Sequence, residues 1–325
     1  MASYIVRRIF YGLVLMAGVV ILNFFLIRLA PGDPAEVIAG EMGGATEEML
    51  ASIRATYGLD KPVLTQLWIY VSNMLQGDLG QSYFFNRPVT ELIALRIWPT
   101  ILLVIAAQVL AITFGVAMGV FAARKPNSVL SGFVTVFATI GYAVPVFWMG
   151  IMLVILFASI IPVFPVQGML DARLHDADWL TQMIDVLYHL ALPAFTLAII
   201  FLAIYARLAR ASMLDVLGAD YVRTARAKGA SERSVLFKHA LRNAALPIIT
   251  VAGLQFGGLI SGALLVETVF NWPGMGTLAF DAILRRDYTT ILGVLFFASL
   301  MVVIANLITD LSYRLADPRI RTGDG

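Results

Sequence analysis

Long apolar runs alternate with polar segments along most of this 325-residue chain. Runs of roughly 20 apolar residues, the length that a helix needs to cross a bilayer, lie near 9–27, 98–123, 132–161, 188–206, 246–266 and 289–311. The third run is longer than one crossing needs, so it is expected to include some interfacial or tilted helix. The pattern is not that of barrel strands. The sequence therefore predicts an all-α integral membrane protein with six transmembrane helices.

A long polar stretch, residues 28–97, separates the first two runs. Within it, Thr46 precedes Glu47, Glu48 and an apolar pattern that continues to Tyr57. A threonine oxygen can accept the free amide hydrogens of a first helical turn, and acidic side chains are favourable there. We therefore predict a helical extracytoplasmic subdomain between spans 1 and 2. The chain divides into residues 1–27 with the N-terminus and first span, 28–97 with the subdomain, and 98–325 with a five-helix core.

The segment between the fourth and fifth runs, residues 207–246, is the most basic part of the chain. It holds eight basic residues against three acidic ones. Loops so rich in arginine and lysine stay on the cytoplasmic side of a membrane. When both termini are placed in the cytoplasm, most of the 23 basic residues fall on that side. We therefore expect this loop and both termini in the cytoplasm.

The same loop has the pattern of two helices with a break between them. Apolar positions recur at three- and four-residue steps, first at Met213, Val216, Leu217, Tyr221 and Ala225, and again at Val235, Leu236, His239 and Leu241. Between the two sets, Gly229 can adopt the left-handed conformation that ends a helix. Ser231 can cap the next helix, whose first turn suits Glu232. We expect a helix, a sharp turn at 228–231 and a second helix at the membrane surface.

Two other segments face the external side in this orientation. Residues 162–187 carry Asp171, Asp176, Asp178 and Asp185, which we interpret as part of a solvated loop. Residues 267–288 contain Asn271, Trp272, Pro273 and Gly274. The proline and glycine predict a tight reversal, and Trp272 is expected to anchor it at the membrane interface. This reversal is also a candidate gate.

Few polar side chains lie within the apolar runs: Asn23, Gln108, Thr113, Gln255, Ser261, Asn306 and Asp310. Polar groups are unfavourable in hydrocarbon unless they face protein or water, so such residues are candidates for a translocation path. The alternative is that they only hydrogen-bond neighbouring helices. Gln108, Gln255, Ser261 and Asn306 are the path candidates. Asp310 is expected to pair with Arg314 one turn later, and no carboxylate is expected near mid-membrane.

Composition argues against several functions. With 60% hydrophobic and 14% charged residues, the chain is too apolar for a soluble domain, and it has no cysteine for a thiolate metal site. Each lysine is followed by proline, glycine or histidine, so none completes a phosphate-binding loop. The three histidines lie in separate segments, which disfavours a metalloprotease. We expect no catalytic residue, no bound cofactor and no metal.

Short motifs are spread over the whole chain. They are Pro31-Gly32-Asp33-Pro34, Tyr57-Gly58-Leu59-Asp60-Lys61-Pro62, Gly77-Asp78-Leu79-Gly80, the run from Asp220 to Gly229, the run from Phe270 to Gly276, Arg286-Asp287-Tyr288 and Asp317-Pro318-Arg319. In these motifs the chain resembles the permease subunits of binding-protein-dependent ABC importers, most closely the peptide, nickel and glutathione class. The general importer loop has Glu-Ala-Ala where this chain has Arg223, Thr224 and Ala225, a departure that is itself typical of the peptide class.

The resemblance implies a type I importer permease fold in the bacterial inner membrane, in contact with lipids and without a nucleic-acid partner. It implies a second, homologous permease and two cytoplasmic ATPase subunits, which bind ATP and Mg²⁺. A periplasmic or lipid-anchored binding protein would deliver di- or oligopeptides, glutathione or a nickel chelate. The ATPase-coupling loop would comprise Arg223, Thr224, Ala225, Arg226, Ala227, Lys228, Gly229, Ala230 and Ser231.

Two other functions stay open at this point. A channel or secondary carrier would move a small solute without ATP, although the internal repeats of many carriers are not evident in this sequence. An intramembrane enzyme would need a catalytic pair that the motifs above do not offer.

Overall fold

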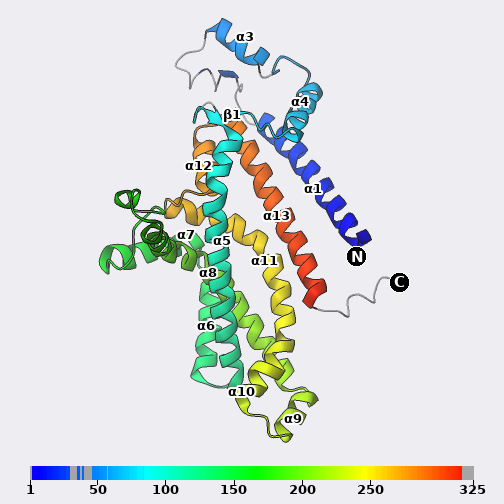
Figure 1. Cartoon of the computed structure of the whole chain (residues 1–325), viewed down its shortest axis with the longest axis vertical. Coiled ribbons are helices and arrows are strands. Elements are labelled where there is room, and N and C mark those ends of the chain that lie inside the picture. Colours follow the sequence, from blue (N-terminus) through cyan, green and yellow to red (C-terminus); the bar gives the residue numbers. More distant parts are fainter. Residues whose placement is uncertain are drawn as a thin grey trace. The chain divides into compact units, whose positions relative to one another are not determined.

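The computed structural model describes residues 2–29, 35–36, 39, 46–56, 58–82 and 84–316. The chain divides into two compact units: Met1–Pro99 with Gly274–Ile304, and Thr100–Pro273 with Ala305–Gly325. Most described residues are helical (Figure 1). The motifs at 31–34 and 317–319 lie outside the described residues.

The first unit combines the N-terminal 99 residues, which include the polar segment after the first span, with residues 274–304. Its elements are α1 (Ala2–Arg28), α3 (Glu47–Thr56), α4 (Val63–Leu75), β1 (Gln81–Ser82), β2 (Arg87–Pro88), the start of α5 (Val89–Arg124), α12 (Met275–Leu284) and most of α13 (Tyr288–Ala316). The two strands pair antiparallel, with Ser82 opposite Arg87. Helices α1 and α13 lie close together at Gly12. A Cβ on this glycine would come within 2.9 Å of Val303 Cγ1.

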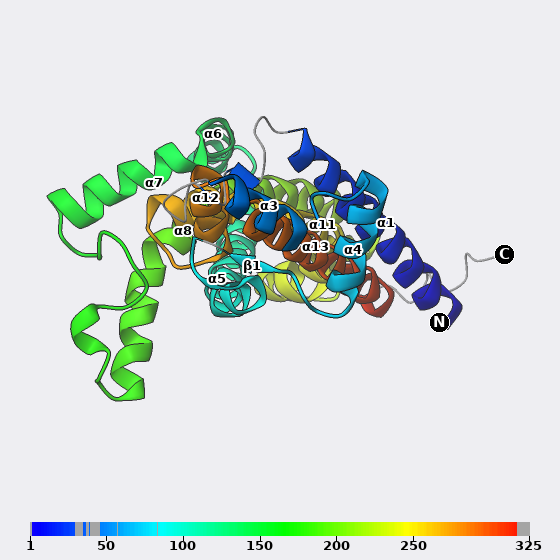
Figure 2. The ribbon, with the colours of Figure 1, turned by 90° about the horizontal axis from the view of Figure 1, so that it is seen from above.

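The second unit is built around one long helix. Its elements are the rest of α5, α6 (Val129–Ala143), α7 (Val146–Val154), the π-helical turn η1 (Ile155–Ile160), the 3₁₀ turn η2 (Ala172–Leu174), α8 (Trp179–Leu217), α9 (Asp220–Ala227), α10 (Glu232–Ser234), the π-helical turn η3 (Val235–Ala240) and α11 (Leu241–Val269). Helix α8 packs against α6, α7 and α11. Figure 2 shows α7 leading outward from α6 before the chain returns to the start of α8.

Two glycines bring the backbones of α5 and α8 close together. A Cβ on Gly119 would lie 2.5 Å from the Ala206 carbonyl oxygen and 2.6 Å from Ala209 Cβ. A Cβ on Gly115 would lie 2.8 Å from the Leu202 carbonyl oxygen. Residues four apart share one helix face, so this face of α5 must stay free of side chains. Close backbone approach at small residues is a common basis of helix packing in membranes.

The predicted spans are confirmed in outline. Among the described residues, five helical segments are long and apolar enough to cross a membrane: Val6–Leu26, Val89–Arg124, Trp179–Leu217, Glu232–Ile260 and Tyr288–Thr309. The third predicted run is a bent pair, Ser131–Gly141 and Val146–Ile160, whose axes differ by 106°. The bend falls at Pro145, because a residue before proline is driven away from helical backbone, and Val144 is extended. The count of six is reached when this pair is one span.

The predicted helix in the polar segment is confirmed and begins as expected. Met49 N–H donates to Thr46 Oγ1 over 3.3 Å, and α3 runs from Glu47 to Thr56. Gly58, at φ +60°, follows it. Helix α4, in the same segment, was not predicted. Two features of the sequence could have predicted it: Pro62 directly before its first residue, and the apolar spacing of Leu64, Trp68 and Val71.

Candidate functional sites

The basic loop begins with a break that the sequence pattern did not indicate. Helix α8 ends at Leu217, and α9 starts at Asp220 after an extended Ala219. The single first helix predicted through residues 213–227 is therefore wrong. The apolar pattern continued across the break to Tyr221, but Tyr221 is exposed, and the buried side chain of α9 is Val222, one residue later.

The predicted turn after α9 is confirmed in its geometry. Gly229 has φ +82°. Its N–H donates to the Arg226 carbonyl over 2.9 Å, and the Ala230 N–H donates to the Ala225 carbonyl over 3.1 Å. This pair of bonds is the Schellman motif, which ends a helix with a left-handed residue. A side chain at 229 would meet no atom within 4 Å, so the requirement for glycine comes from the backbone alone.

The next helix also starts as predicted, but it is not a separate surface helix. Ser234 N–H donates to Ser231 Oγ over 3.3 Å. Glu232 Oε1 accepts a 3.0 Å hydrogen bond from Arg226 Nε, which closes the turn from the side. From Glu232 the chain stays helical through α10, η3 and α11 to Val269. The second helix is therefore continuous with the fifth span, because Val235, Leu236 and Ala240 are buried where an independent surface helix would be exposed.

Helix α9 exposes most of its polar side chains. The exposed residues are Arg223, Thr224, Arg226, Ala227 and Lys228, whereas Ala225 and Ala230 are half-buried. Arg223 pairs with Asp220 at 3.6 Å, but both side chains are largely exposed, so the pair holds the guanidinium only weakly. Tyr221 Oη accepts a 2.8 Å hydrogen bond from Asn243 Nδ2 and ties α9 to α11. Figure 1 shows α9 and α10 together at one end of α8 and α11.

The reversal after α11, which the sequence places on the external side, is a second Schellman turn, built without glycine. Asn271 has φ +46°, its N–H donates to the Thr268 carbonyl over 3.4 Å, and the Trp272 N–H donates to the Glu267 carbonyl over 2.8 Å. The Gly168 N–H donates to the Phe270 carbonyl over 2.9 Å and ties the segment 162–187 to the turn. These hydrogen bonds and the positive φ of Asn271 confirm the predicted tight reversal.

One prediction about this region is wrong, and one buried carboxylate was not expected. Trp272 is fully buried, so it is a core residue and not an interfacial anchor. Glu267, assigned from sequence to the external segment, lies within α11 with no exposed surface. Its Oε1 accepts a 2.6 Å hydrogen bond from Thr100 Oγ1 on α5. The sequence did place Glu267 directly after the apolar run 246–266, but its burial depends on packing that periodicity does not reveal.

The four path candidates lie in different surroundings. Gln108 Nε2 donates to Tyr205 Oη and to the Ala252 carbonyl, each over 3.1 Å, so it joins α5, α8 and α11. Gln255 on α11 is half-buried and Asn306 on α13 is exposed. The side chains of Ser261, Asp310 and Arg314 lie outside the described part of the chain. Asn23 is half-buried and Thr113 exposed.

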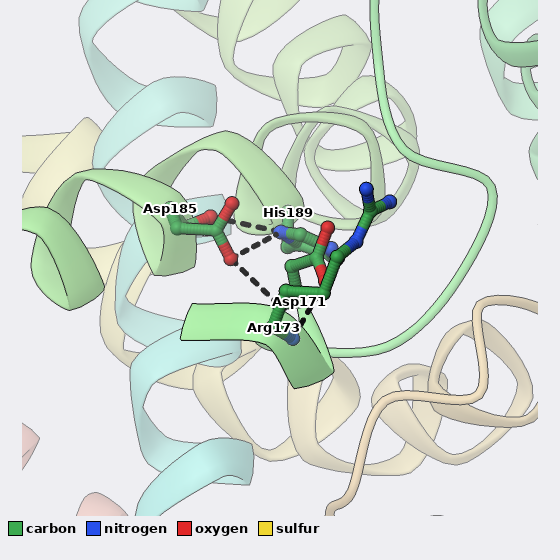
Figure 3. A network of polar contacts seen from close by, with 4 residues as sticks. All are labelled: Asp171, Arg173, Asp185 and His189. Carbon is green, nitrogen blue, oxygen red and sulfur yellow. Dashed lines mark hydrogen bonds and ion pairs between the residues drawn. The ribbon is translucent and has the colours of Figure 1, made fainter. Parts of the chain in front are cut away.

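The acidic segment at 162–187 contains a network of polar contacts, in which Figure 3 shows Asp171, Arg173, Asp185 and His189. Asp176 and Asp178 are exposed as predicted. Asp185, in contrast, has a side chain only 14% exposed, 3.2 Å from His189 Nδ1, whose side chain is 8% exposed. Asp185 Oδ2 also accepts a 2.8 Å hydrogen bond from Asp171 N–H. The interpretation of all four carboxylates as solvated is therefore wrong for Asp185.

Two of these carboxylates cap helical turns, which lowers their pKa. Asp178 accepts 2.7 Å and 3.2 Å hydrogen bonds from Thr181 Oγ1 and N–H at the start of α8. The side-chain bond is the main cause of its lowered pKa. The backbone N–H of Arg173 is the main cause of the lowered pKa of Asp171. Within the described residues, no group of three or more His, Cys, Asp or Glu side chains is arranged to hold a metal.

Comparison with known protein families covers nearly the whole chain. Residues 115–322 match the family described as binding-protein-dependent transport system inner membrane component. Residues 1–104 match the family of the N-terminal part of such membrane components.

Curated relatives are similar over almost their full length. The probable peptide ABC transporter permease protein y4tP of Sinorhizobium fredii is 46% identical over 321 residues, 99% of this chain and 100% of its own. The di/tripeptide transport system permease protein DppB of Pseudomonas aeruginosa is 42% identical, with 99% of each chain covered. The glutathione transport system permease protein GsiC of Escherichia coli is 39% identical, again with 99% of each covered.

Among solved structures, an inward-facing form of the MetNI methionine ABC transporter is similar in fold. The TM-score is 0.55 over 70% of this chain and 96% of that chain, at 15% sequence identity. At this identity the likeness concerns the fold alone.

Proposed function

The chain belongs to the family of inner-membrane components of binding-protein-dependent transport systems, and we propose that it is a permease subunit of an ATP-driven peptide importer. Members of the family are transport subunits. The observation that carries the proposal is the α9 turn: a short exposed helix ended by Gly229 at one end of two long membrane helices. An ATP-independent carrier has no evident need for such a helix.

We propose that α9 couples this chain to a cytoplasmic ATPase. The residues concerned are Arg223, Thr224, Ala225, Arg226, Ala227, Lys228, Gly229, Ala230 and Ser231. Helix α9 joins α8 through only two residues and joins α10 through the bonded Gly229 turn, so it cannot move without moving both long helices. Its exposed basic side chains suit a groove on an ATPase, and closure of that groove would rock the spans. ATP and Mg²⁺ would bind on the ATPase and not on this chain.

We propose that the motion reaches the external reversal through α11. Residues Glu232–Val269 form one helical run between the α9 turn and the turn at Asn271. The candidate gate, Asn271, Trp272, Pro273 and Gly274, directly follows this run, so a tilt of α11 would displace it. The proposed path residues are Gln108, Gln255, Ser261 and Asn306, which lie on α5, α11 and α13. Half-buried Gln108 already links three helices at once and is the best placed of them.

The proposed assembly contains this chain, a second homologous permease, two ATPase subunits and a periplasmic or lipid-anchored binding protein. Both termini and the α9 turn lie in the cytoplasm in this assembly, because that side then carries most of the arginine and lysine. Residues 1–27 contribute the N-terminus and first span, 28–97 the periplasmic subdomain, and 98–325 the core. The substrate class is short peptides, since the named relatives include peptide, di/tripeptide and glutathione permeases.

Affinity purification of the tagged chain from mild detergent, followed by mass spectrometry, tests the proposal. We expect a second permease and ATPase subunits to co-purify, and ATP-dependent uptake of dipeptide when these are reconstituted with the binding protein. A chain that purifies alone and moves solute into liposomes without ATP would overturn the proposal in favour of a carrier.

A further inference from the structure

Helix α4 presents a stripe of exposed apolar side chains. Leu64 is 74% exposed, Trp68 72% and Leu75 84%. Their spacings of four and seven residues place all three on one narrow face of the helix. None of the helix's residues, VLTQLWIYVSNML, is charged. Contiguous exposed apolar surface of this kind marks contact with something other than water.

The side of α4 away from the stripe is held by the protein. Gln66 is buried, and its Nε2 donates to the carbonyls of Lys61 and Leu59 over 2.6 Å and 3.2 Å. The ring of Tyr70 stacks on Phe24 of α1, with centroids 5.9 Å apart. Burial raises the pKa of Tyr70. These anchors fix the rotation of α4, so the apolar stripe faces away from its contacts with the rest of the unit.

The contact with Phe24 also fixes the level of α4 relative to the bilayer. Phe24 lies in the last turn of the apolar span Val6–Leu26, and Figure 1 shows α4 beside the C-terminal end of α1. Helix α4 is therefore placed at the level where this span ends. Its 13 residues extend about 20 Å, too short to cross a hydrocarbon core of about 30 Å. An apolar helix of this length is either a buried core helix or an interfacial one, and the exposed stripe excludes the first.

We propose that α4 is an interfacial membrane helix. The apolar stripe, formed by Leu64, Trp68 and Leu75, lies at the boundary between head groups and acyl chains. The leaflet is the one where α1 ends. Tryptophan favours this level, because its ring is apolar and its N–H can still meet water. The helix ties the polar segment between the first two spans to the lipid surface, a role separate from transport. Since α4 has no cationic side chain, apolar burial and not anionic head-group attraction holds it there.

The absence of cysteine from the chain allows a direct test, because an introduced thiol is then the only one in this chain. A parallel sample with the cysteine-free chain gives the background label on the co-purifying subunits. Leu64→Cys and Leu75→Cys place a nitroxide label on the stripe. Asn73→Cys is the matched control, since Asn73 is exposed on the opposite face of the same helix. The full chain, with the subunits that co-purify, is reconstituted in phosphatidylcholine liposomes. Relaxation of each label by oxygen, which concentrates in the bilayer, is compared with relaxation by a water-soluble nickel chelate.

We expect the ratio of oxygen to nickel accessibility to be several-fold higher at 64 and 75 than at 73, and unchanged at high salt. A ratio at 64 or 75 equal to that at 73 would show that the stripe faces water and overturn the proposal. Low accessibility to both reagents would show that a protein surface covers the stripe, which also overturns it. The three variants are at exposed positions, and unchanged gel-filtration behaviour verifies that they fold. The readout needs no transport, so it is independent of the importer proposal.

Discussion

Ser82 and Asp287 are 205 positions apart in the sequence, and Ser82 Oγ donates a 2.5 Å hydrogen bond to Asp287 Oδ2. The same carboxylate caps α13, because it accepts 3.2 Å and 2.6 Å bonds from the N–H and Oγ1 of Thr290. Both Ser82 and Asp287 are buried. Two of the motifs singled out in the sequence, Gly77 to Gly80 and Arg286 to Tyr288, therefore adjoin one structural junction.

Asp287→Ala should weaken this junction. The substitution removes a helix cap and leaves the buried hydroxyl of Ser82 without this acceptor, which together cost about 2 kcal/mol of unfolding free energy. Ser82→Ala removes only one of the bonds and should cost about half as much. The midpoint of thermal unfolding in detergent measures both, with Asp281→Ala on the exposed side of α12 as the control. Equal midpoints for Asp287→Ala and the control would contradict the assigned role.

Gly119→Val should destabilise the core far more than a comparable change elsewhere. A Cβ at 119 collides with backbone of α8, which cannot move aside cheaply, so we expect a loss of about 3 kcal/mol. Gly132→Ala on α6 is the control, since a Cβ there meets no atom within 4 Å; it should change stability by less than about 1 kcal/mol. Denaturation curves in mixed micelles give both values. Similar curves for the two variants would argue against the close α5–α8 contact.

Gly229→Pro should separate ATP hydrolysis from peptide uptake. Proline removes the N–H that bonds the Arg226 carbonyl and fixes φ near −65°, whereas the turn needs +82°. The reconstituted assembly should hydrolyse ATP while uptake falls at least ten-fold. Gly229→Asn should retain most uptake, because asparagine tolerates the left-handed region and does so in this chain at Asn271.

Gly18→Ala serves as the folding control for this series, since a Cβ at 18 meets nothing within 4 Å. Normal coupling in the proline variant would remove the main argument for α9 as the coupling helix.

Asp178→Ala should loosen the start of α8 near neutral pH. The pKa of Asp178 is lowered from its ordinary value of 3.8, so its cap contributes fully above that value and is lost as the pH falls through the lower, folded-state pKa. Amide hydrogen exchange at residues 179–182, corrected for the intrinsic rate, should be a few-fold faster in the variant at pH 7. The difference should vanish in strong acid. The control is Asp176→Ala, because Asp176 is an exposed neighbour. In this variant the amide hydrogens of residues 179–182 should exchange as fast as in the parent protein at every pH.

Gln108→Leu and Tyr205→Phe distinguish a path residue from a helix-bonding one. Both substitutions remove the bond between the two side chains, and each should lower the unfolding free energy by about 1 kcal/mol. Only Gln108→Leu also removes the amide itself. If Gln108 lines the path, uptake should fall several-fold in that variant and stay near normal in Tyr205→Phe. Equal uptake in the two would assign Gln108 to helix bonding alone.

Features with a local cause were predictable from the sequence. The Thr46 cap, the Ser231 cap and the left-handed Gly229 each depend on residues within one helical turn, and all three are confirmed. The membrane spans were predictable because apolar length is itself the cause. The break at Ala219 escaped detection because apolar periodicity continued across it.

Features with a long-range cause were not predictable. Burial of Trp272 and Glu267 depends on segments far away in the chain, and the tryptophan's ordinary preference for interfaces pointed the other way. The link between Ser82 and Asp287 joins segments whose sequences carry no sign of each other. The sharp bend at Pro145 was signalled by a proline, but its 106° angle depends on how α7 packs against α8.

The length of α8 bears on what its basic end can touch. The helix has 39 residues, but its last turns do not all extend past the apolar layer. Met213 shares a buried cluster with Val120 of α5, and Val120 lies in the predicted run 98–123. Only the four residues after Met213 extend beyond this level, about 6 Å at about 1.5 Å per residue, which is about the depth of one head-group layer. The charges of α9 therefore lie within about one Debye length, roughly 8 Å at physiological salt, of the lipid phosphates. A soluble protein that binds α9 meets it at the head-group surface and competes there with anionic lipid.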